Sequence, residues 1–128
     1  MEKDHKACTD ILRPVRDALD ILNGKWKLPI IISLSFGDKR FTEISKEVHG
    51  ITDRMLSKEL RDLEINGLIS RMVDTSFPVK VTYSLTPHSK TLDPVIESLK
   101  KWGILHRKKL EKDCKEYGQN ANTAKAIK

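Results

Sequence analysis

Residues 51–71 (ITDRMLSKELRDLEINGLISR) carry apolar and basic side chains on opposite sides of one predicted helix. The apolar positions repeat at the spacing of a single helical face: Leu56, Leu60 and Leu63. At about 100° per residue, these leucines fall within an arc of about 60°, as a core-facing side should. The cations Arg54, Lys58 and Arg61 fall almost directly opposite, and the acidic residues toward the flanks: Asp53, Glu59, Asp62 and Glu64. The segment therefore predicts a helix with buried leucines and an outward basic ridge (Arg54, Lys58 and Arg61).

Both ends of this helix carry boundary signals. Thr52 can serve as the N-cap, and Asp53 favours the positive end of the helix dipole. Gly67 stands where a left-handed residue commonly closes a helix. We therefore expect the helix to run from Thr52 to about Asn66.

A shorter helix is predicted immediately upstream, in the segment FTEISKEVHG. Thr42 is its expected cap, Ile44 and Val48 share one face, and Gly50 closes it. Two short helices joined by a tight turn form a helix-turn-helix.

Two strand-like runs follow, residues 68–73 and 79–85, on either side of the turn-like segment DTSFP. In the second run, the apolar residues alternate with polar ones: Val79, Val81, Tyr83 and Leu85 against Lys80, Thr82 and Ser84. A period of two indicates a strand with one wet face. The two runs predict a β-hairpin directly after the helix-turn-helix, which is the plan of a winged helix.

Two helices are predicted before the helix-turn-helix. The first runs from Pro14 to Leu22 and is stopped by Asn23–Gly24. The apolar run from Trp26 to Leu34 is too dense for periodicity to distinguish helix from strand. We interpret it as a buried helix that ends near Phe36–Gly37.

A long amphipathic helix is predicted after Thr86–Pro87. Its stripe repeats with helical spacing among mostly charged residues: Leu92, Val95, Ile96, Leu99, Trp102, His106 and Leu110. A stripe of this length outruns a small domain and calls for a partner at its far end. The last residues, KEYGQNANTAKAIK, have few large apolar groups and are predicted to be disordered.

Composition limits the class of protein. A chain of 128 residues with 38% hydrophobic and 33% charged residues fits one domain. It has no apolar run near the ~20 residues that cross a bilayer, and MEKDHKACTD does not resemble a signal peptide. We therefore expect a soluble, cytoplasmic protein without a membrane partner. The net charge of +6 is compatible with nucleic acid, yet residues 37–71 carry 7 Lys and Arg against 7 Asp and Glu. The placement of charge on each helix therefore matters more than the total.

The residues that commonly carry enzymatic or metal chemistry are sparse. The four histidines lack HExxH spacing, and the sequence has no glycine-rich phosphate loop. The only Cys, His and carboxylate residues near one another late in the chain are His106, Asp113 and Cys114. The two cysteines, Cys8 and Cys114, form neither a disulfide framework nor a CxxC pair. We expect no enzyme, no metal site and no cofactor.

The basic ridge suits double-stranded DNA. An α-helix fits the major groove, where Arg and Lys can reach guanine or phosphate oxygens. We expect the following residues to contact DNA: Thr52, Arg54, Ser57, Lys58 and Arg61 from the helix, and Lys39, Arg40, Arg71 and Lys80 from its surroundings. Two alternatives stay open. Arg54 and Lys58 could instead pair with Asp62 or Glu59 as a solvated face, or the winged helix could be a protein-contact module without specific DNA binding.

Several motifs resemble one family in order and spacing. They are GKW at 24–26, RFTEI at 40–44, GITDRMLSKELRDLEINGLISR at 50–71, Pro78 followed by VTYSLT at 81–86, and LDPVIESLKKWG at 92–103. With these motifs, the chain resembles the HxlR-type winged helix-turn-helix regulators, which are relatives of MarR. The resemblance spans residues 8–106 as the DNA-binding domain and leaves 107–128 as the end of the C-terminal helix and a tail. It implies a bacterial or archaeal transcriptional regulator, mainly α with a small antiparallel hairpin, which binds DNA as a homodimer through N- and C-terminal dimerisation helices.

Two departures from the family pattern stand out. The usual Cys-Pro near the N-terminus is Cys8-Thr9 here, and the usual glycine after the second strand is Ser89. Some family members sense oxidants or electrophiles through that cysteine, so Cys8 is a possible redox sensor. The alternative is an inert thiol, because Asp4 and Asp10 oppose the effect of the nearby cations on thiolate formation.

The long C-terminal stripe and the N-terminal helix are the expected two-fold interface. Its candidate residues are Leu19, Leu99, Trp102 and His106. Trp102 is the expected anchor, because buried aromatic residues dominate such contacts. The small-molecule or redox inducer is not identified by the sequence.

Overall fold

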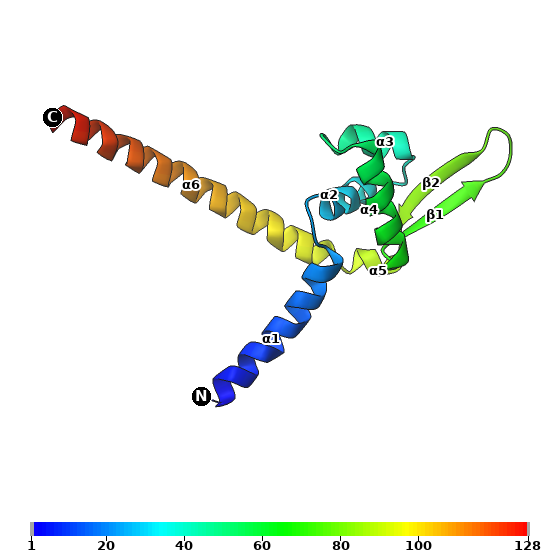
Figure 1. The fold of residues 1–128 in the computed structure, drawn as a ribbon, viewed down its shortest axis with the longest axis horizontal. Coiled ribbons are helices and arrows are strands. Elements are labelled where there is room, and N and C mark those ends of the chain that lie inside the picture. Colours follow the sequence, from blue (N-terminus) through cyan, green and yellow to red (C-terminus); the bar gives the residue numbers. More distant parts are fainter. Residues whose placement is uncertain (1, 128) are drawn as a thin grey trace. The chain divides into compact units, whose positions relative to one another are not determined.

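The computed structural model describes residues 2–127, and the side chains of residues 4–118 (Figure 1). The chain divides into two compact units, residues 1–90 and 91–128. The elements of the first unit are α1 (Glu2–Ile21), α2 (Lys27–Ser35), α3 (Phe41–Glu47), α4 (Asp53–Ile65), β1 (Ile69–Asp74), β2 (Lys80–Leu85) and α5 (Pro87–Lys90). The second unit contains α6 (Asp93–Ile127).

The helix-turn-helix core lies where α2, α3 and α4 meet the base of the hairpin. Its buried apolar residues include Ile30, Ile31, Leu34, Ile44, Leu56, Leu60, Leu63, Leu68 and Ile69. The three leucines predicted for the inner face of α4 are 0–2% exposed, which confirms that face. Each such side chain stabilises the fold by about 1.5–3 kcal/mol through burial. The predicted buried helix before the motif is also confirmed as α2.

The ends of α4 follow the local signals in the sequence. The Thr52 hydroxyl accepts a hydrogen bond from the Met55 N–H at 3.2 Å, as an N-cap does. At the other end, Gly67 has a φ of 74°, and the Leu68 N–H donates to the Leu63 carbonyl at 2.9 Å. A left-handed residue with such a return bond is the usual close of a helix, so both predicted boundaries are confirmed.

The cap predicted for the shorter helix is wrong. Arg40 is the N-cap of α3, and its backbone N–H donates to the Glu43 carboxylate at 3.2 Å. Thr42 therefore lies within the first turn of α3, and the Glu43 carboxylate takes part in a capping box with Arg40. The helix also ends at Glu47, and Gly50, with a φ of 88°, belongs to the turn before α4.

The predicted hairpin is confirmed as β1 and β2, which pair antiparallel from Ile69 opposite Leu85 to Asp74 opposite Lys80. Its base is joined to the core by backbone hydrogen bonds between Lys39 and Tyr83 at 3.0 and 2.8 Å. Away from that base the hairpin extends beyond the helices (Figure 1). The expected strand with one wet face is wrong, because residues 81–85 of β2 are half-buried on both faces, while Val79 before the strand is 63% exposed.

Helix α1 begins well before the predicted start at Pro14, which lies inside the helix. Upstream residues continue the apolar pattern, so the helix has one face along its length: Ile11, Leu12, Val15 and Leu19. These side chains are 42–66% exposed. The helix thus carries an apolar face that the described residues of its own unit, up to residue 90, leave exposed.

The predicted long C-terminal helix is confirmed as α6. Its apolar stripe is largely exposed, with Leu99 at 49% and Trp102 at 62%. The helix bounds reach Ile127, but the side chains of residues 119–128 lie outside the described residues. The disordered tail predicted there therefore stays a prediction.

Candidate nucleic-acid interface

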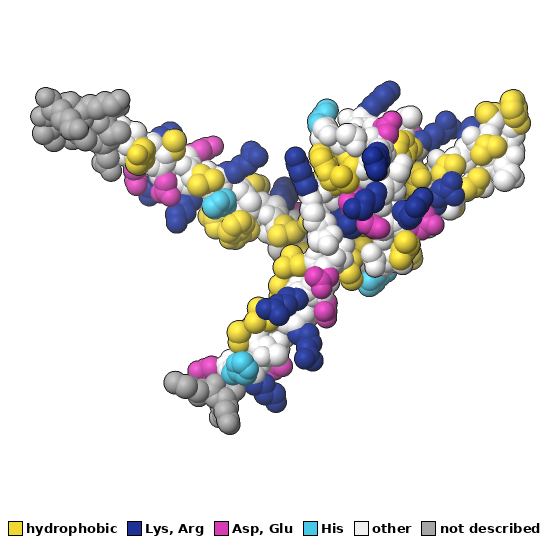
Figure 2. All heavy atoms as spheres, in the orientation of Figure 1, with side chains coloured by type: hydrophobic (Ala, Val, Ile, Leu, Met, Phe, Trp, Pro, Cys, Tyr) yellow, Lys and Arg dark blue, Asp and Glu magenta, His cyan; other side chains and the backbone are white. Residues whose placement is uncertain are grey.

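The basic ridge lies on the outer side of α4. Arg54, Lys58 and Arg61 are exposed, as is Ser57 between them, whereas the leucines of the same helix are buried. Lys and Arg side chains gather over this part of the core and along the hairpin (Figure 2). The fold therefore turns a basic surface toward solvent.

A buried ion pair holds the inner side of α4. The Lys27 ammonium of α2 lies 2.7 Å from Glu59 Oε2 and 3.7 Å from Asp62 Oδ2, and it donates to Asn23 Oδ1 at 3.1 Å. Lys27 and Glu59 are only 6% and 8% exposed. The flank position expected for Glu59 is the one next to the leucines, and its carboxylate is buried there against Lys27. The sequence contains a signal for this pair: Lys27 interrupts an apolar run, and Glu59 falls about 40° from Leu63 around the helix.

Two acids of α4 face Lys27 rather than the basic ridge. Glu59 is buried at 2.7 Å from the ammonium, and Asp62 lies at 3.7 Å with its side chain 39% exposed. In the part of the chain that the structure describes, no ion pair involves Arg54, Lys58 or Arg61. The basic ridge thus keeps its charge for an external partner.

A groove of about 400 Å³ lies between α4 and the hairpin. Its lining comes from both elements: Ser57, Leu60, Arg61, Glu64, Arg71 and Tyr83. Two guanidinium groups beside hydroxyl groups are a donor set suited to phosphate oxygens. The structure therefore brings Arg61 and Arg71 to one site, although they come from different elements.

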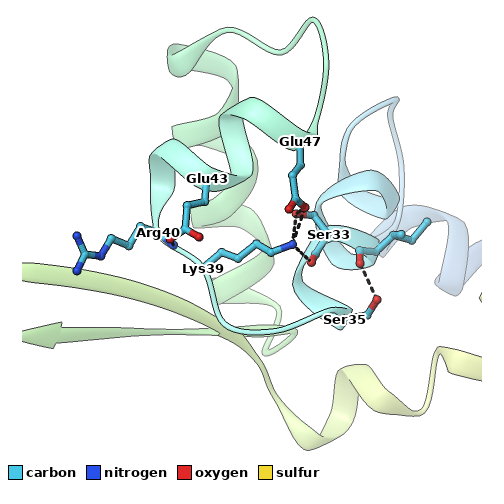
Figure 3. Close-up of polar contacts among 7 residues, drawn as sticks. Ser33, Ser35, Lys39, Arg40, Glu43 and Glu47 are labelled. Carbon is cyan, nitrogen blue, oxygen red and sulfur yellow. Dashed lines mark hydrogen bonds and ion pairs between the residues drawn. The ribbon is translucent and has the colours of Figure 1, made fainter.

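Lys39 and Arg40 have separate surroundings (Figure 3). The Lys39 ammonium lies 2.5 Å from Glu47 Oε2 and donates to the Ser33 carbonyl at 2.6 Å, and its side chain is 11% exposed. Hydrogen bonds from Lys39 and then Ser33 lower the pKa of Glu47 below its ordinary value of 4.5. Lys39 therefore joins α2 to α3, while Arg40 points away from this network and is exposed.

The cation predicted for the hairpin, Lys80, is exposed and lies opposite Asp74 in the strand register. The Asp74 carboxylate accepts hydrogen bonds from the Ser76 hydroxyl at 2.6 Å and the Ser76 N–H at 3.0 Å. These bonds keep the pKa of Asp74 below 3.8, so it is charged at neutral pH. The end of the hairpin consequently has one charge of each sign.

The remaining predicted site residues lie on the terminal helices. Cys8 is exposed on α1, and Leu19 of the same helix is 61% exposed. On α6, the rings of Trp102 and His106 stack with centroids 4.9 Å apart and planes within 8°. Both helices thus present apolar and aromatic groups to solvent.

The described residues contain no group of three or more His, Cys, Asp or Glu side chains able to hold a metal ion. None of their helices is both long and apolar enough to cross a bilayer.

Comparison with known proteins gives one consistent family. The model of the HxlR-like helix-turn-helix family matches residues 21–111. The HTH-type transcriptional regulator YdeP of Bacillus subtilis (strain 168) is 46% identical over 99 residues, which cover 77% of each chain. The reduced form of the redox regulator HypR is 42% identical with a TM-score of 0.72, over 77% of this chain and 97% of that one. The reduced form of the regulator YodB from B. subtilis is 34% identical with a TM-score of 0.65, over 70% and 88%. The chain therefore belongs to the HxlR-like helix-turn-helix family and is a winged-helix, DNA-binding transcriptional regulator.

Proposed function

We propose that this regulator binds a roughly palindromic operator as a homodimer. Dimerisation is supported by the apolar faces of α1 and α6, where Leu19, Leu99 and Trp102 are 49–62% exposed. Contiguous apolar surfaces of this kind mark association sites. A second copy of the chain provides an identical surface, as two-fold contacts require.

Sequence-specific readout is assigned to α4, and the observation that carries it is the unpaired basic ridge. Glu59 is buried against Lys27, Asp62 lies 3.7 Å from the same ammonium, and no ion pair of Arg54 or Lys58 occurs among the described residues. With α4 in the major groove, Arg54, Ser57 and Lys58 meet base edges, because residues near the start of a recognition helix make such contacts. The N-terminal end of the helix, at Thr52, faces phosphate.

Phosphate contacts are assigned to the cations around α4. Arg61 and Arg71 share the groove between the helix and the hairpin, and two further cations are exposed, Arg40 at the start of α3 and Lys80 at the turn end of β2. Contacts of this kind position a protein on the duplex without reading its sequence. Lys39 has no part in this set, because Ser33 and Glu47 engage its ammonium.

A dimer places its two α4 helices in successive major grooves on one face of the duplex. The half-sites are then about 10 bp apart, or a near multiple of that spacing. Such binding requires no catalytic activity, and it takes place in the cytoplasm, where bacterial DNA lies.

The test begins with an operator selected by the wild-type protein from a random DNA pool. Arg54→Ala should weaken binding to that operator by about 1–3 kcal/mol and relax the preference at one base position per half-site. Lys90→Ala is the matched control, because it removes one exposed cation outside α4 and the hairpin. Full retention of affinity and base preference by both Arg54→Ala and Lys58→Ala would favour the protein-contact module instead.

A redox response through Cys8 is a second candidate function. It is supported by the exposure of the Cys8 thiol on α1 and by the similarity to HypR, which is named as a redox regulator. Exposed thiols are open to reversible oxidation. Mild diamide should therefore change operator affinity in the wild-type protein and in Cys114→Ser, but not in Cys8→Ser. Equal responses in wild type and Cys8→Ser would end this hypothesis.

A further inference from the structure

The turn of the hairpin exposes an aromatic side chain. Phe77 is 99% exposed, and Val79 beside it is 63% exposed. In Figure 2, hydrophobic side chains occupy the far end of the hairpin, beyond the Lys and Arg side chains nearer the core. A phenylalanine that packs against nothing adds no stability to the fold. When a partner covers it, such a ring can bury about 150–250 Å², which makes aromatic side chains major contributors to the stability of interfaces. Contact with a partner would therefore bury the Phe77 ring.

The charges around the turn are compatible with DNA as that partner. Residues 75–79 are uncharged, and the carboxylate of Asp74, engaged by Ser76, lies opposite Lys80 in the register. Farther along the hairpin, Arg71 is exposed and faces the groove it shares with α4. The turn itself is uncharged and exposes apolar side chains, the Asp74 charge beside it lies opposite Lys80, and Arg71 adds a cation farther along β1. Such an arrangement matches a duplex, whose phosphates flank an apolar stack of bases.

The length of the hairpin matches the spacing of the DNA grooves. Each strand has six residues, which corresponds to a reach of about 20 Å at ~3.3 Å per residue. The minor groove next to an occupied major groove lies about half a turn away, or roughly 17 Å. That groove is only about 6 Å wide, so it admits a side-chain ring but not a two-stranded ribbon.

We propose that Phe77 is an apolar wedge that enters the minor groove beside each half-site and partly separates one base step. This inference rests on α4 occupying the major groove, as proposed above. Phenylalanine wedges of this kind kink the duplex by about 20–90°. Separating a base step adds sequence specificity, because flexible pyrimidine–purine steps separate more easily than other base steps.

The experiment uses the selected operator with a donor and an acceptor dye at its two ends. Wild-type protein should increase energy transfer by bending the duplex. Phe77→Ala should remove most of that increase and weaken binding about tenfold, within the range known for base–aromatic stacking. The slope of affinity against salt should stay unchanged, because no phosphate contact is lost. Phe77→Leu should keep the bend, since leucine also acts as a wedge, and Val79→Ala is the matched control.

Each other outcome overturns the wedge. Unchanged bending and affinity in Phe77→Ala would show that the ring does not enter the duplex. A variant that binds DNA normally but sediments at lower mass would assign the turn to contact with a second copy. Wild-type protein that selects no duplex would overturn the proposed operator binding, and the wedge with it. Misfolding is not expected to confuse these results, because Phe77 is 99% exposed.

Discussion

Removing the charge of Lys27 should destabilise the winged helix strongly. In Lys27→Met the apolar stem is kept, but the Glu59 carboxylate, whose side chain is 10% exposed, loses the ammonium at 2.7 Å. Leaving one partner of a buried pair alone costs about 3–5 kcal/mol. Proteins of this size have a total free energy of unfolding of about 5–15 kcal/mol, so the loss is a large part of it.

Urea denaturation at fixed protein concentration measures this loss. With a slope of about 2 kcal/mol per molar urea, a cost near 4 kcal/mol should lower the midpoint by about 2 M. Lys25→Met is the control: Lys25 is exposed and lies 4.8 Å from the Trp26 ring centre, a contact worth only about 0.5–1 kcal/mol. The double variant Lys27→Met, Glu59→Leu should recover most of the stability, because two apolar groups can replace a buried pair.

The result that would refute this reasoning is a Lys27→Met protein within about 1 kcal/mol of wild type, the range of an exposed ion pair. Glu59 would then reach water without Lys27. A double variant no more stable than Lys27→Met would likewise show that the unpaired carboxylate is not the cause of the loss.

Three further predictions concern assembly, pH and salt. Trp102→Ala should sediment as a monomer at low micromolar concentration, because the substitution removes the aromatic anchor of the proposed interface. A folded variant that stays dimeric would place Trp102 outside that interface. Glu47→Gln should flatten the acid side of the plot of unfolding free energy against pH, measured by urea titration. The lowered pKa of Glu47 stabilises the wild-type protein above about pH 4.5, and this stability is lost as the pH falls through the pKa of Glu47 in the folded state. Parallel plots for the two proteins would contradict this. Lys80→Ala should weaken binding to all duplexes alike and reduce the salt slope by about 1, whereas a change at one base position would make Lys80 a base reader.

The sequence alone predicts the elements whose signals are local. The leucines of α4 repeat with helical spacing, Thr52 caps the helix, and Gly67 closes it, and each of these features depends on neighbouring residues only. The order of helix, turn, helix and hairpin then limits the fold to a winged helix. Apolar residues with a period of about 3.6 or 2 predict a helix or a strand, because these are the periods at which side chains return to the same face of each element.

Local signals also explain where the sequence analysis fails. The alternation of Val79 to Leu85 predicts a wet and a dry face only if a strand lies against a core along its length. This hairpin extends away from the core, so its two faces are similarly exposed. The cap of α3 could have been predicted from the sequence, because Glu43 stands three residues after Arg40, where a capping box places its acid.

Only the tertiary structure decides which charges are free. Lys27 and Glu59 belong to helices separated by the whole of α3. The spacing of each helix places a charge beside its apolar face, but it does not indicate which opposite charge lies across from it. Lys39 resembles any surface cation in the sequence, yet its ammonium is bound by Glu47 and Ser33. An ion pair forms where two side chains come within a few ångströms, and packing between distant elements determines that proximity. The sequence therefore places the basic ridge on one side of α4, and the long-range packing of α2 places Lys27 against Glu59 on the other.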